Sequence, residues 1–488
     1  MARKAAMTEA ALVALGADKL ARLVLDEAEQ NSSFKRIVTA ALAGTKGPQA
    51  IVAVVRRRLT ALERARTFID WQRRKAFIAD LKATVAAITR ELGPADPAAA
   101  TEQLVRFLTT ADAVFERLDD SSGQVQSVYW DAVDALPGLV EQLEPDMKAA
   151  LGEQLVPRLL ADGYGLIERA FVALLPVLPI DAVERLDTAL AHAQEPTAAR
   201  GRTQSVDDQD FEQRLRADRI IRARQAIADR RGDVDAYIAL AGNGLHRAPN
   251  TIGIAERLLA AGRMAEALEW IRRPTRPGLR VMLRHDLSDA SLGFDSAERE
   301  RTRVEIRILE AMGDRGTAQA LRWKSFEDGL DVAMLRDYLA HLPDFEEFDA
   351  LDRAFAHVAA SPPRHAALAF FLAWPRLDLA ARFVIEHRDA WDGGQYGLLA
   401  PAAEALEDTE PRAAAVLLYR ALIDEILRRA RSPAYGHAAR YLARLDALAA
   451  SGASPEPNAP DHDTYRHNLR QAHGRKAGFW SLIDNSTR

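Results

Sequence analysis

The sequence contains no cysteine. This absence excludes disulfide bonds, thiolate zinc sites, iron–sulfur clusters and a cysteine nucleophile, and leaves histidine and carboxylate ligands for any metal. Aromatic residues make up only 7% of the chain, and the formal net charge is −5 over 488 residues. A net charge this small predicts no general attraction to nucleic acid or to anionic membranes.

Long uninterrupted apolar runs are also missing. The most apolar stretch, AFVALLPVLPIDAV at residues 170–183, contains two prolines and is too short to cross a bilayer. The N-terminal segment carries charged residues such as Glu9, Asp18 and Arg22 among its apolar ones, unlike a secretory signal peptide. We therefore expect a cytoplasmic protein with no membrane-embedded part.

β-branched runs are scarce, and Ala, Leu, Arg and Glu, which favour helices, fill most of the sequence. The recurring apolar period is 3.6 residues, as in the stretch from residue 51 to residue 71. One face of that stretch carries Ile51, Val54, Val55, Leu59 and Leu62. Short clusters of Gly, Pro, Asp and Asn separate such stretches, which predicts antiparallel helical pairs.

Three segments share one pattern. Each has a helix, a tight turn and a second helix with small alanines, and each contains a tryptophan. They are residues 254–274, 306–326 and 371–387. This pattern is typical of tetratricopeptide-like repeats, although the turn glycines Gly262 and Gly313 lie 51 residues apart rather than about 34. We predict an all-α fold, an alpha-alpha superhelix or solenoid built from irregular helical hairpins.

Two polar stretches predict the boundaries along the chain. Residues 195–210 contain few core residues, so we expect an N-terminal helical region over 1–200 and a repeat region over 201–450. A proline-rich stretch predicts an extended linker over 451–463, followed by a C-terminal capping helix over 464–488.

Five segments carry a resemblance to known proteins: TFIDW (67–71), FERLDDSSGQV (115–125), LYRALIDEIL (418–427), YGHAARYLARLDAL (435–448) and HGRKAGFWSLI (473–483). Together they resemble an uncharacterised bacterial family of helical-repeat proteins, whose helical region also resembles one found beside SWIM-type zinc fingers. A SWIM finger needs cysteines, so its zinc and any nucleic-acid role are not implied for this chain. The resemblance implies an all-helical, repeat-like fold of unknown function.

The stretch DDSSG at residues 119–123 is a candidate ligand loop, with Asp119, Asp120 and Ser121 as its candidate residues. It lacks the alternating acids and the closing glutamate of a calcium loop. The alternative that we favour is structural: an Asp or Ser caps the next helix, and Gly123 supplies the turn.

Basic residues gather in the N-terminal part. Residues 34–92 contain 13 Lys and Arg against 4 Asp and Glu, whereas residues 93–157 contain 3 against 12. The candidate basic surface consists of Arg56, Arg57, Arg58, Arg73, Arg74 and Lys75. It could bind nucleic acid, but we favour neutralisation by the acidic segment. We expect the aromatic residues of this run, Phe68, Trp71 and Phe77, to lie in the core.

The final stretch, HDTYRHNLRQAHGRKAGFW at 462–480, allows three interpretations. The first is a zinc site, but the spacing of His462, His467 and His473 differs from that of a helical zinc site. The second is phosphate binding by the basic residues, which the nearby aspartates disfavour. The apolar stripe predicts instead that this segment folds back and caps the preceding helix. The stripe consists of Tyr465, Leu469, Phe479, Trp480 and Leu482.

No catalytic, cofactor-binding or metal-binding residue is predicted, because the templates for hydrolases, nucleotide loops and metal sites fail. We therefore predict a non-catalytic helical-repeat scaffold that binds a protein or peptide partner and needs no cofactor. One alternative is a nucleic-acid-associated protein that uses the basic helix at 56–75. Another is an enzyme whose site in a groove has no recognisable motif.

Overall fold

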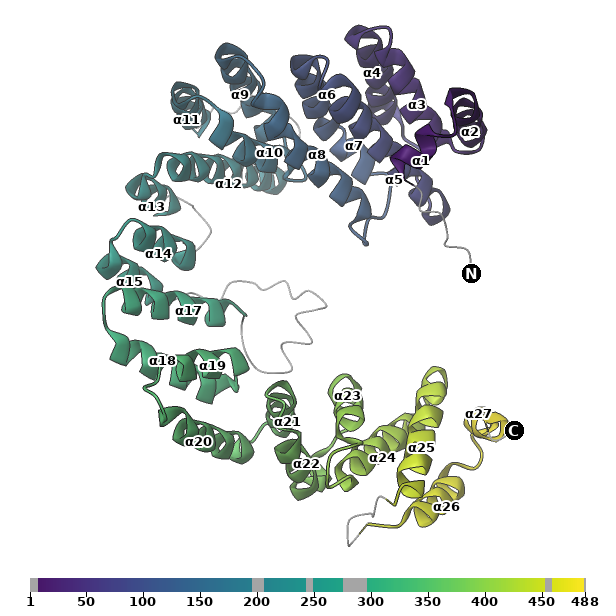
Figure 1. Cartoon of the computed structure of the whole chain (residues 1–488). Helices are drawn as coiled ribbons and strands as arrows, with labels where there is room; N and C mark the ends of the chain where they lie inside the picture. The colour runs from purple at the N-terminus through teal and green to yellow at the C-terminus, as the bar shows by residue number, and fades with distance from the viewer. Residues whose placement is uncertain (1–7, 195–205, 243–248, 275–295, 453–458, 487–488) are drawn as a thin grey trace. The chain divides into compact units, whose positions relative to one another are not determined.

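Helices form nearly all of the structure (Figure 1). The structure is a computed structural model that describes residues 8–194, 206–242, 249–274, 296–452 and 459–486. Within these residues the only β-type pairing is an isolated parallel bridge between Ile69 and Leu118. The prediction of an all-α protein is thus confirmed. None of the described helices is both long and apolar enough to span a membrane.

The chain divides into two compact units, Met1–Asn250 and Thr251–Arg488. The predicted boundary near residue 200 lies outside the described residues. Unit 1 contains α1 Glu9–Val13, α2 Ala17–Gln30, α3 Ser32–Gly44, α4 Pro48–Arg64, α5 Trp71–Ala86, η1 Ala87–Leu92, α6 Pro97–Thr109, α7 Ala111–Phe115, α8 Gln124–Val140, α9 Pro145–Leu160, α10 Leu166–Leu174, η2 Leu175–Val177, α11 Ile180–Gln194, α12 Val206–Arg231 and α13 Val234–Gly242.

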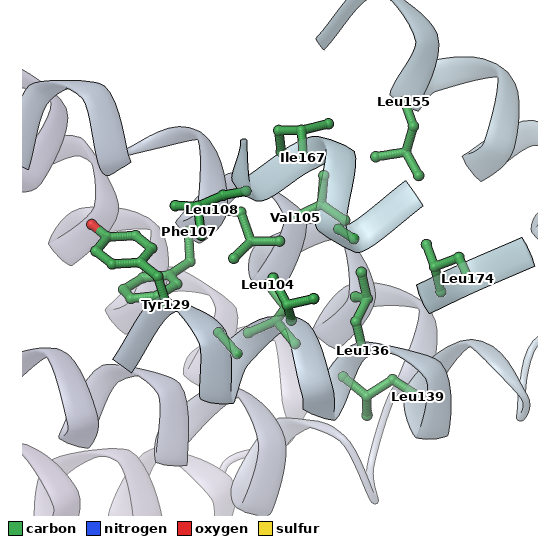
Figure 2. Close-up of a cluster of buried hydrophobic side chains, with 14 of the residues drawn as sticks. Leu104, Val105, Phe107, Leu108, Tyr129, Leu136, Leu139, Leu155, Ile167 and Leu174 are labelled. Carbon is green, nitrogen blue, oxygen red and sulfur yellow. The ribbon is translucent and has the colours of Figure 1, made fainter. Parts of the chain in front are cut away.

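The core of unit 1 is best seen where α6, α8, α9 and α10 meet (Figure 2). Leucine and valine side chains from these helices fill the centre, and the Tyr129 ring stacks on Phe107 with ring centroids 4.6 Å apart. The Tyr129 hydroxyl also lies 2.9 Å from the Thr110 hydroxyl, so its polar end is hydrogen-bonded although the ring is fully buried. This core holds α8 in place behind the loop that precedes it.

Unit 2 is built from a further series of helices. They are α14 Thr251–Ala260, α15 Met264–Ile271, α17 Ser296–Ala311, α18 Arg315–Gly329, α19 Val332–Ala340, α20 Glu346–Ala360, α21 Arg364–Ala373, α22 Leu377–Glu386, η3 Arg388–Ala390, α23 Tyr396–Leu406, α24 Ala413–Arg428, η4 Ser432–Ala434, α25 Tyr435–Ala450, α26 His462–His473 and α27 Ala477–Ser486.

The three repeated segments each form a pair of packed helices in unit 2: α14 with α15, α17 with α18, and α21 with α22. Gly262 and Gly313 make the first two turns with φ angles of 75° and 80°, a left-handed conformation that glycine adopts without strain. The helical hairpins that the sequence predicted at these places are therefore present.

The C-terminal segment packs against α25 through α26 and α27 (Figure 1). The predicted linker over 451–463 ends inside α26, and its residues 453–458 lie outside the described part. The expected single helix over 464–488 is divided in two, because the chain turns between His473 and Ala477. Phe479 and Trp480 are buried, whereas Leu482 of the expected stripe is 41% exposed.

Candidate functional site

The two regions that the sequence singled out in the N-terminal part lie side by side. The backbone N–H of Ile69 donates to the Arg117 carbonyl oxygen over 2.8 Å. The Arg74 Nη1 atom donates to the Asp119 carbonyl oxygen over 2.9 Å. The extended chain between α4 and α5 is thereby fastened to the loop between α7 and α8, which places the acidic loop beside the start of the basic helix α5.

The carboxylates of this loop are engaged by backbone N–H groups. Asp119 accepts from the backbone N–H of Ser121 over 3.0 Å. Asp120 accepts from Val125 over 3.1 Å and from Gln126 over 2.8 Å, and so satisfies two N–H groups in the first turn of α8. These contacts match the structural interpretation of the loop as a helix cap.

The predicted basic helix over 56–75 is divided between the end of α4 and the start of α5, and two of its six candidate residues pair with acids in other helices. Arg56 pairs with Glu102 of the acidic segment at 3.1 Å. Arg58 turns inward and pairs with the buried Asp80 of α5. Arg57, Arg73 and Lys75 are exposed, while Arg74 is half-buried against the loop.

Arg58 belongs to a buried polar cluster around Asp80. Arg36 and Arg58 both pair with this carboxylate, and Arg117 lies close enough to Arg58 to repel its charge. Burial, reinforced by repulsion from Arg36 and Arg117, lowers the pKa of Arg58 to about 10. These side chains hold α3, α4 and α5 together and are therefore part of the framework of unit 1.

For two of the three aromatic residues in the basic run, the expectation that they lie in the core is wrong. We expected Phe68 and Trp71 in the core, but Phe68 is 63% exposed and Trp71 is 76% exposed. Phe77 is half-buried against the core, as expected. The difference arises because Phe68 lies in the extended link before α5 and Trp71 is the first residue of that helix, so the helical period does not apply to them.

A second candidate site, which sequence reasoning missed, is a cavity of about 550 Å³ in unit 2. It lies among α14, α17, α18 and α19. Its lining consists of Glu256, Glu300, Arg303, Ile306, Arg307, Glu310, Arg322, Ala333, Met334, Asp337 and His341. Of the charged groups, four are carboxylates and three are guanidinium groups, which leaves a small negative excess when His341 is neutral.

Arg322 organises the cavity from α18. The residue is only 2% exposed. Its Nε atom donates to Asp337 over 2.6 Å, and its Nη2 atom donates to Glu310. Burial would lower the pKa of Arg322, but the hydrogen bonds to Asp337 and Glu310 outweigh that effect and raise it. Arg322 therefore remains charged and fixes both carboxylates in place.

His341 lies between the same two carboxylates. Its Nε2 atom is 3.5 Å from Glu310, and its Nδ1 atom is 3.6 Å from the Asp337 carboxylate and 2.8 Å from the Asp337 carbonyl oxygen. Nearer the rim, Arg307 pairs with Glu256 at 2.7 Å, and both side chains are about half exposed. The cavity thus combines a fixed ion-pair network with rim charges that water can reach.

Sequence reasoning missed this cavity because its charges come from residues far apart along the chain. Glu256 and Arg307 are 51 positions apart, and the Arg322 contacts extend from α17 to α19. One local signal was available: Arg322 lies four positions after Ala318 and four positions before Phe326, so it falls on the apolar face of its helix. A charged residue on the core-facing side of a helix indicates a buried ion pair.

The terminal histidines are not brought together. His462 contacts Asp446 through Nε2 at 2.6 Å, and the backbone carbonyl of His473 accepts from the Trp480 indole N–H over 3.0 Å. Among the residues that the structure describes, no group of three or more His, Asp or Glu side chains is placed to hold a metal ion.

Comparison with known proteins identifies a family for nearly the whole chain. No curated protein and no solved structure matches it. A family model described as "Family of unknown function (DUF6880)" matches residues 2–482. This match covers both compact units and both candidate sites. The chain therefore belongs to DUF6880, a family of unknown function.

Proposed function

We propose that this protein is a non-catalytic helical scaffold that binds a peptide segment of a partner protein in the cavity of unit 2. The helical pairs of this unit support a tetratricopeptide-like repeat architecture, a class that binds peptides between its helices. We place its function in the cytoplasm, in keeping with a chain that has no cysteine.

The observation that carries the proposal is the pairing of charges around the cavity. The side chain of Arg322 is only 3% exposed, whereas both side chains of the Arg307–Glu256 pair are about half exposed. Exposed ion pairs contribute only about 0–1 kcal/mol, so a ligand can replace one partner at small cost. A charged side chain of a peptide can therefore exchange with a rim partner.

The composition of the lining indicates the kind of peptide. Carboxylates outnumber guanidinium groups by one, and Met334 and Ala333 add an apolar patch beside them. A segment with a lysine or arginine next to an apolar residue would complement both features. We therefore expect a basic, partly apolar peptide to bind more tightly than an acidic one.

Fluorescence anisotropy with two labelled synthetic peptides tests this proposal. One peptide alternates leucine with lysine, and the other alternates leucine with glutamate. We expect the basic peptide to bind, and Glu300→Lys on α17 to weaken that binding about tenfold, equivalent to roughly 1.4 kcal/mol.

Glu269→Lys on α15 is the matched control, because Glu269 is exposed and does not line the cavity. It makes the same change of charge and should leave the affinity unchanged. Equal losses in both variants would mean that only the overall charge attracts the peptide. A basic peptide that binds no better than the acidic one would contradict the proposal outright.

A further inference from the structure

The link between α4 and α5 exposes two aromatic rings among positive charges. We define the Trp71 surface as the exposed residues Arg64, Phe68, Trp71, Arg73 and Lys75. Large aromatic side chains dominate the energetics of cores and interfaces, and two so exposed within four positions are typical of an interaction site.

The positive charges of the Trp71 surface remain available. Arg64 and Lys75 form no ion pair within the described part of the chain. Arg73 reaches Asp70 only at 3.7 Å. Next to this surface, Arg66 donates to the carbonyl oxygens of Glu63 and Ala65, which leaves its positive charge without a carboxylate partner.

Most of the acids near this surface accept hydrogen bonds from backbone N–H groups. The Asp70 carboxylate accepts from the Arg73 backbone N–H over 2.9 Å as the cap of α5. Asp119 and Asp120 accept backbone N–H groups of their own loop. Glu116 and Asp119 are the exposed acids of that loop. Positive charge is therefore in excess around the two rings.

The backbone that carries the rings is ordered before any ligand binds. Ile69, between Phe68 and Trp71, is held to Arg117 by a backbone hydrogen bond. The Arg117 Nη1 atom also donates to the Thr67 carbonyl oxygen, and Arg74 fastens α5 to the Asp119 carbonyl. A ligand would then meet a preorganised surface, which lowers the entropy cost of binding.

We propose that the Trp71 surface binds single-stranded nucleic acid, a function beyond the peptide binding proposed for unit 2. Unpaired bases stack on Trp71 and Phe68, and the phosphates contact Arg64, Arg73 and Lys75. Stacking is possible for every base but requires bases that are free of a duplex, so single strands are favoured without sequence preference. Duplex DNA offers this surface only its phosphates.

The test uses the full chain and a fluorescein-labelled oligothymidine of about 15 nucleotides, long enough for several bases and phosphates to bind at once. Anisotropy titrations compare this strand with a duplex of the same length. We expect tighter binding of the single strand, with the duplex in the non-specific range of about 10⁻⁴ to 10⁻⁶ M near physiological salt. Trp71→Ala and Phe68→Ala should each weaken single-strand binding about 5- to 100-fold.

Phe348→Ala is the matched control. Phe348 on α20 is 62% exposed, almost as much as Phe68, but lies in an acidic stretch with Glu346, Glu347 and Asp349. We expect this variant to bind like the wild type. Circular dichroism melts of all variants should coincide, because each altered side chain is exposed and contributes little to the core.

Salt dependence separates the contribution of the phosphates from stacking. The logarithm of the affinity for a single strand falls with the logarithm of salt by about 0.7 per phosphate contact. Arg73→Gln and Lys75→Gln should each reduce that slope by about 0.7, whereas Trp71→Ala should leave it unchanged.

Three results would overturn the proposal. The first is equal or tighter binding of the duplex. The second is unchanged affinity in Trp71→Ala and Phe68→Ala. The third is tighter binding of a labelled leucine–glutamate peptide than of oligothymidine, abolished by Trp71→Ala, which would assign the surface to an acidic protein segment. The first two results do not bear on the cavity of unit 2, which the Glu300→Lys variant tests separately. After the third result, the basic and acidic peptides would be compared again in the Trp71→Ala variant, in which only the cavity can bind them.

Discussion

At the scale of single residues, burial determines how a charged side chain affects the stability of this protein. Asp424 on α24 accepts a hydrogen bond of 2.9 Å from the Tyr465 hydroxyl of α26. Burial raises the pKa of Asp424, and this effect outweighs the hydrogen bond from Tyr465 and the attraction of His473 and Arg420. The carboxylate therefore joins α24 to α26 at some cost in stability.

This cost predicts a pH-dependent effect of Asp424→Asn. Because folding raises the pKa, the folded protein binds this proton more tightly than the unfolded chain does. The charged form destabilises the fold near neutral pH, and the effect disappears as the pH falls through the folded pKa toward the unfolded value. Asparagine removes the charge and keeps an acceptor for Tyr465. We expect a higher melting temperature than wild type near pH 7 and a smaller difference near pH 4.

Thermal melts across this pH range check the prediction. A gain of 1 kcal/mol would raise the melting temperature by roughly 2–4 °C in a unit of this size. Asp389→Asn, at an exposed position in η3, serves as a control for the loss of one surface charge. A constant difference at every pH, or a lower melting temperature near pH 7, would show that burial is not the dominant effect.

At the scale of elements, the last two helices cover the face of α25. The Phe479 ring lies 6.1 Å from the Tyr435 ring at the start of α25, and the Arg470 guanidinium lies 4.8 Å from the centre of the Trp480 ring. Arg466 and His462 both contact Asp446 of α25 at 2.6 Å. Apolar contacts at the centre and ion pairs at the edge are what a terminal cap of a helical array requires.

Truncating the Trp480 side chain to alanine tests whether this cap stabilises unit 2. Trp480→Ala should lower the free energy of unfolding by about 3–5 kcal/mol, because a buried ring is replaced by a cavity. Chemical denaturation followed by circular dichroism measures the loss. Leu482→Ala in the same helix is the control, and it should cost much less because Leu482 is largely exposed.

Deleting residues 451–488 extends this test from one ring to the whole segment. We expect a lower melting temperature and aggregation, since the face of α25 that packs on α26 and α27, including Tyr435, would lose its cover. If the segment only bound a partner and did not cover α25, the truncated protein would be as stable as the full chain. Melting temperatures measured on both proteins distinguish the two.

At the scale of the whole molecule, each compact unit carries its own hydrophobic core. One cluster of buried residues runs from Ala40 to Ile227 and the other from Ile306 to Trp480. We therefore expect residues 1–250 and 251–488, expressed separately, to give helical spectra and cooperative melts. A unit that stays unfolded alone, while the full chain melts cooperatively, would show that its core is incomplete.

The local features of this protein were determined by its sequence. The helices at 254–274 and 306–326 follow from their 3.6-residue period, and the turns follow from Gly262 and Gly313. The cap of α8 by the DDSSG loop was also predictable, because a side chain meets backbone N–H groups only a few positions away. Each of these depends on interactions within one short stretch of chain.

The tertiary structure alone decided which side chains are exposed and which charges meet. Phe68 and Trp71 are large and apolar, as core residues usually are. The link that carries them is hydrogen-bonded to the loop before α8, and both rings remain in solvent. Arg322 lies on the apolar face of α18, but only the packing of α17 and α19 against that face supplies its partners Glu310 and Asp337. Both outcomes depend on packing between segments that are distant in the chain, and local periodicity carries no information about that packing.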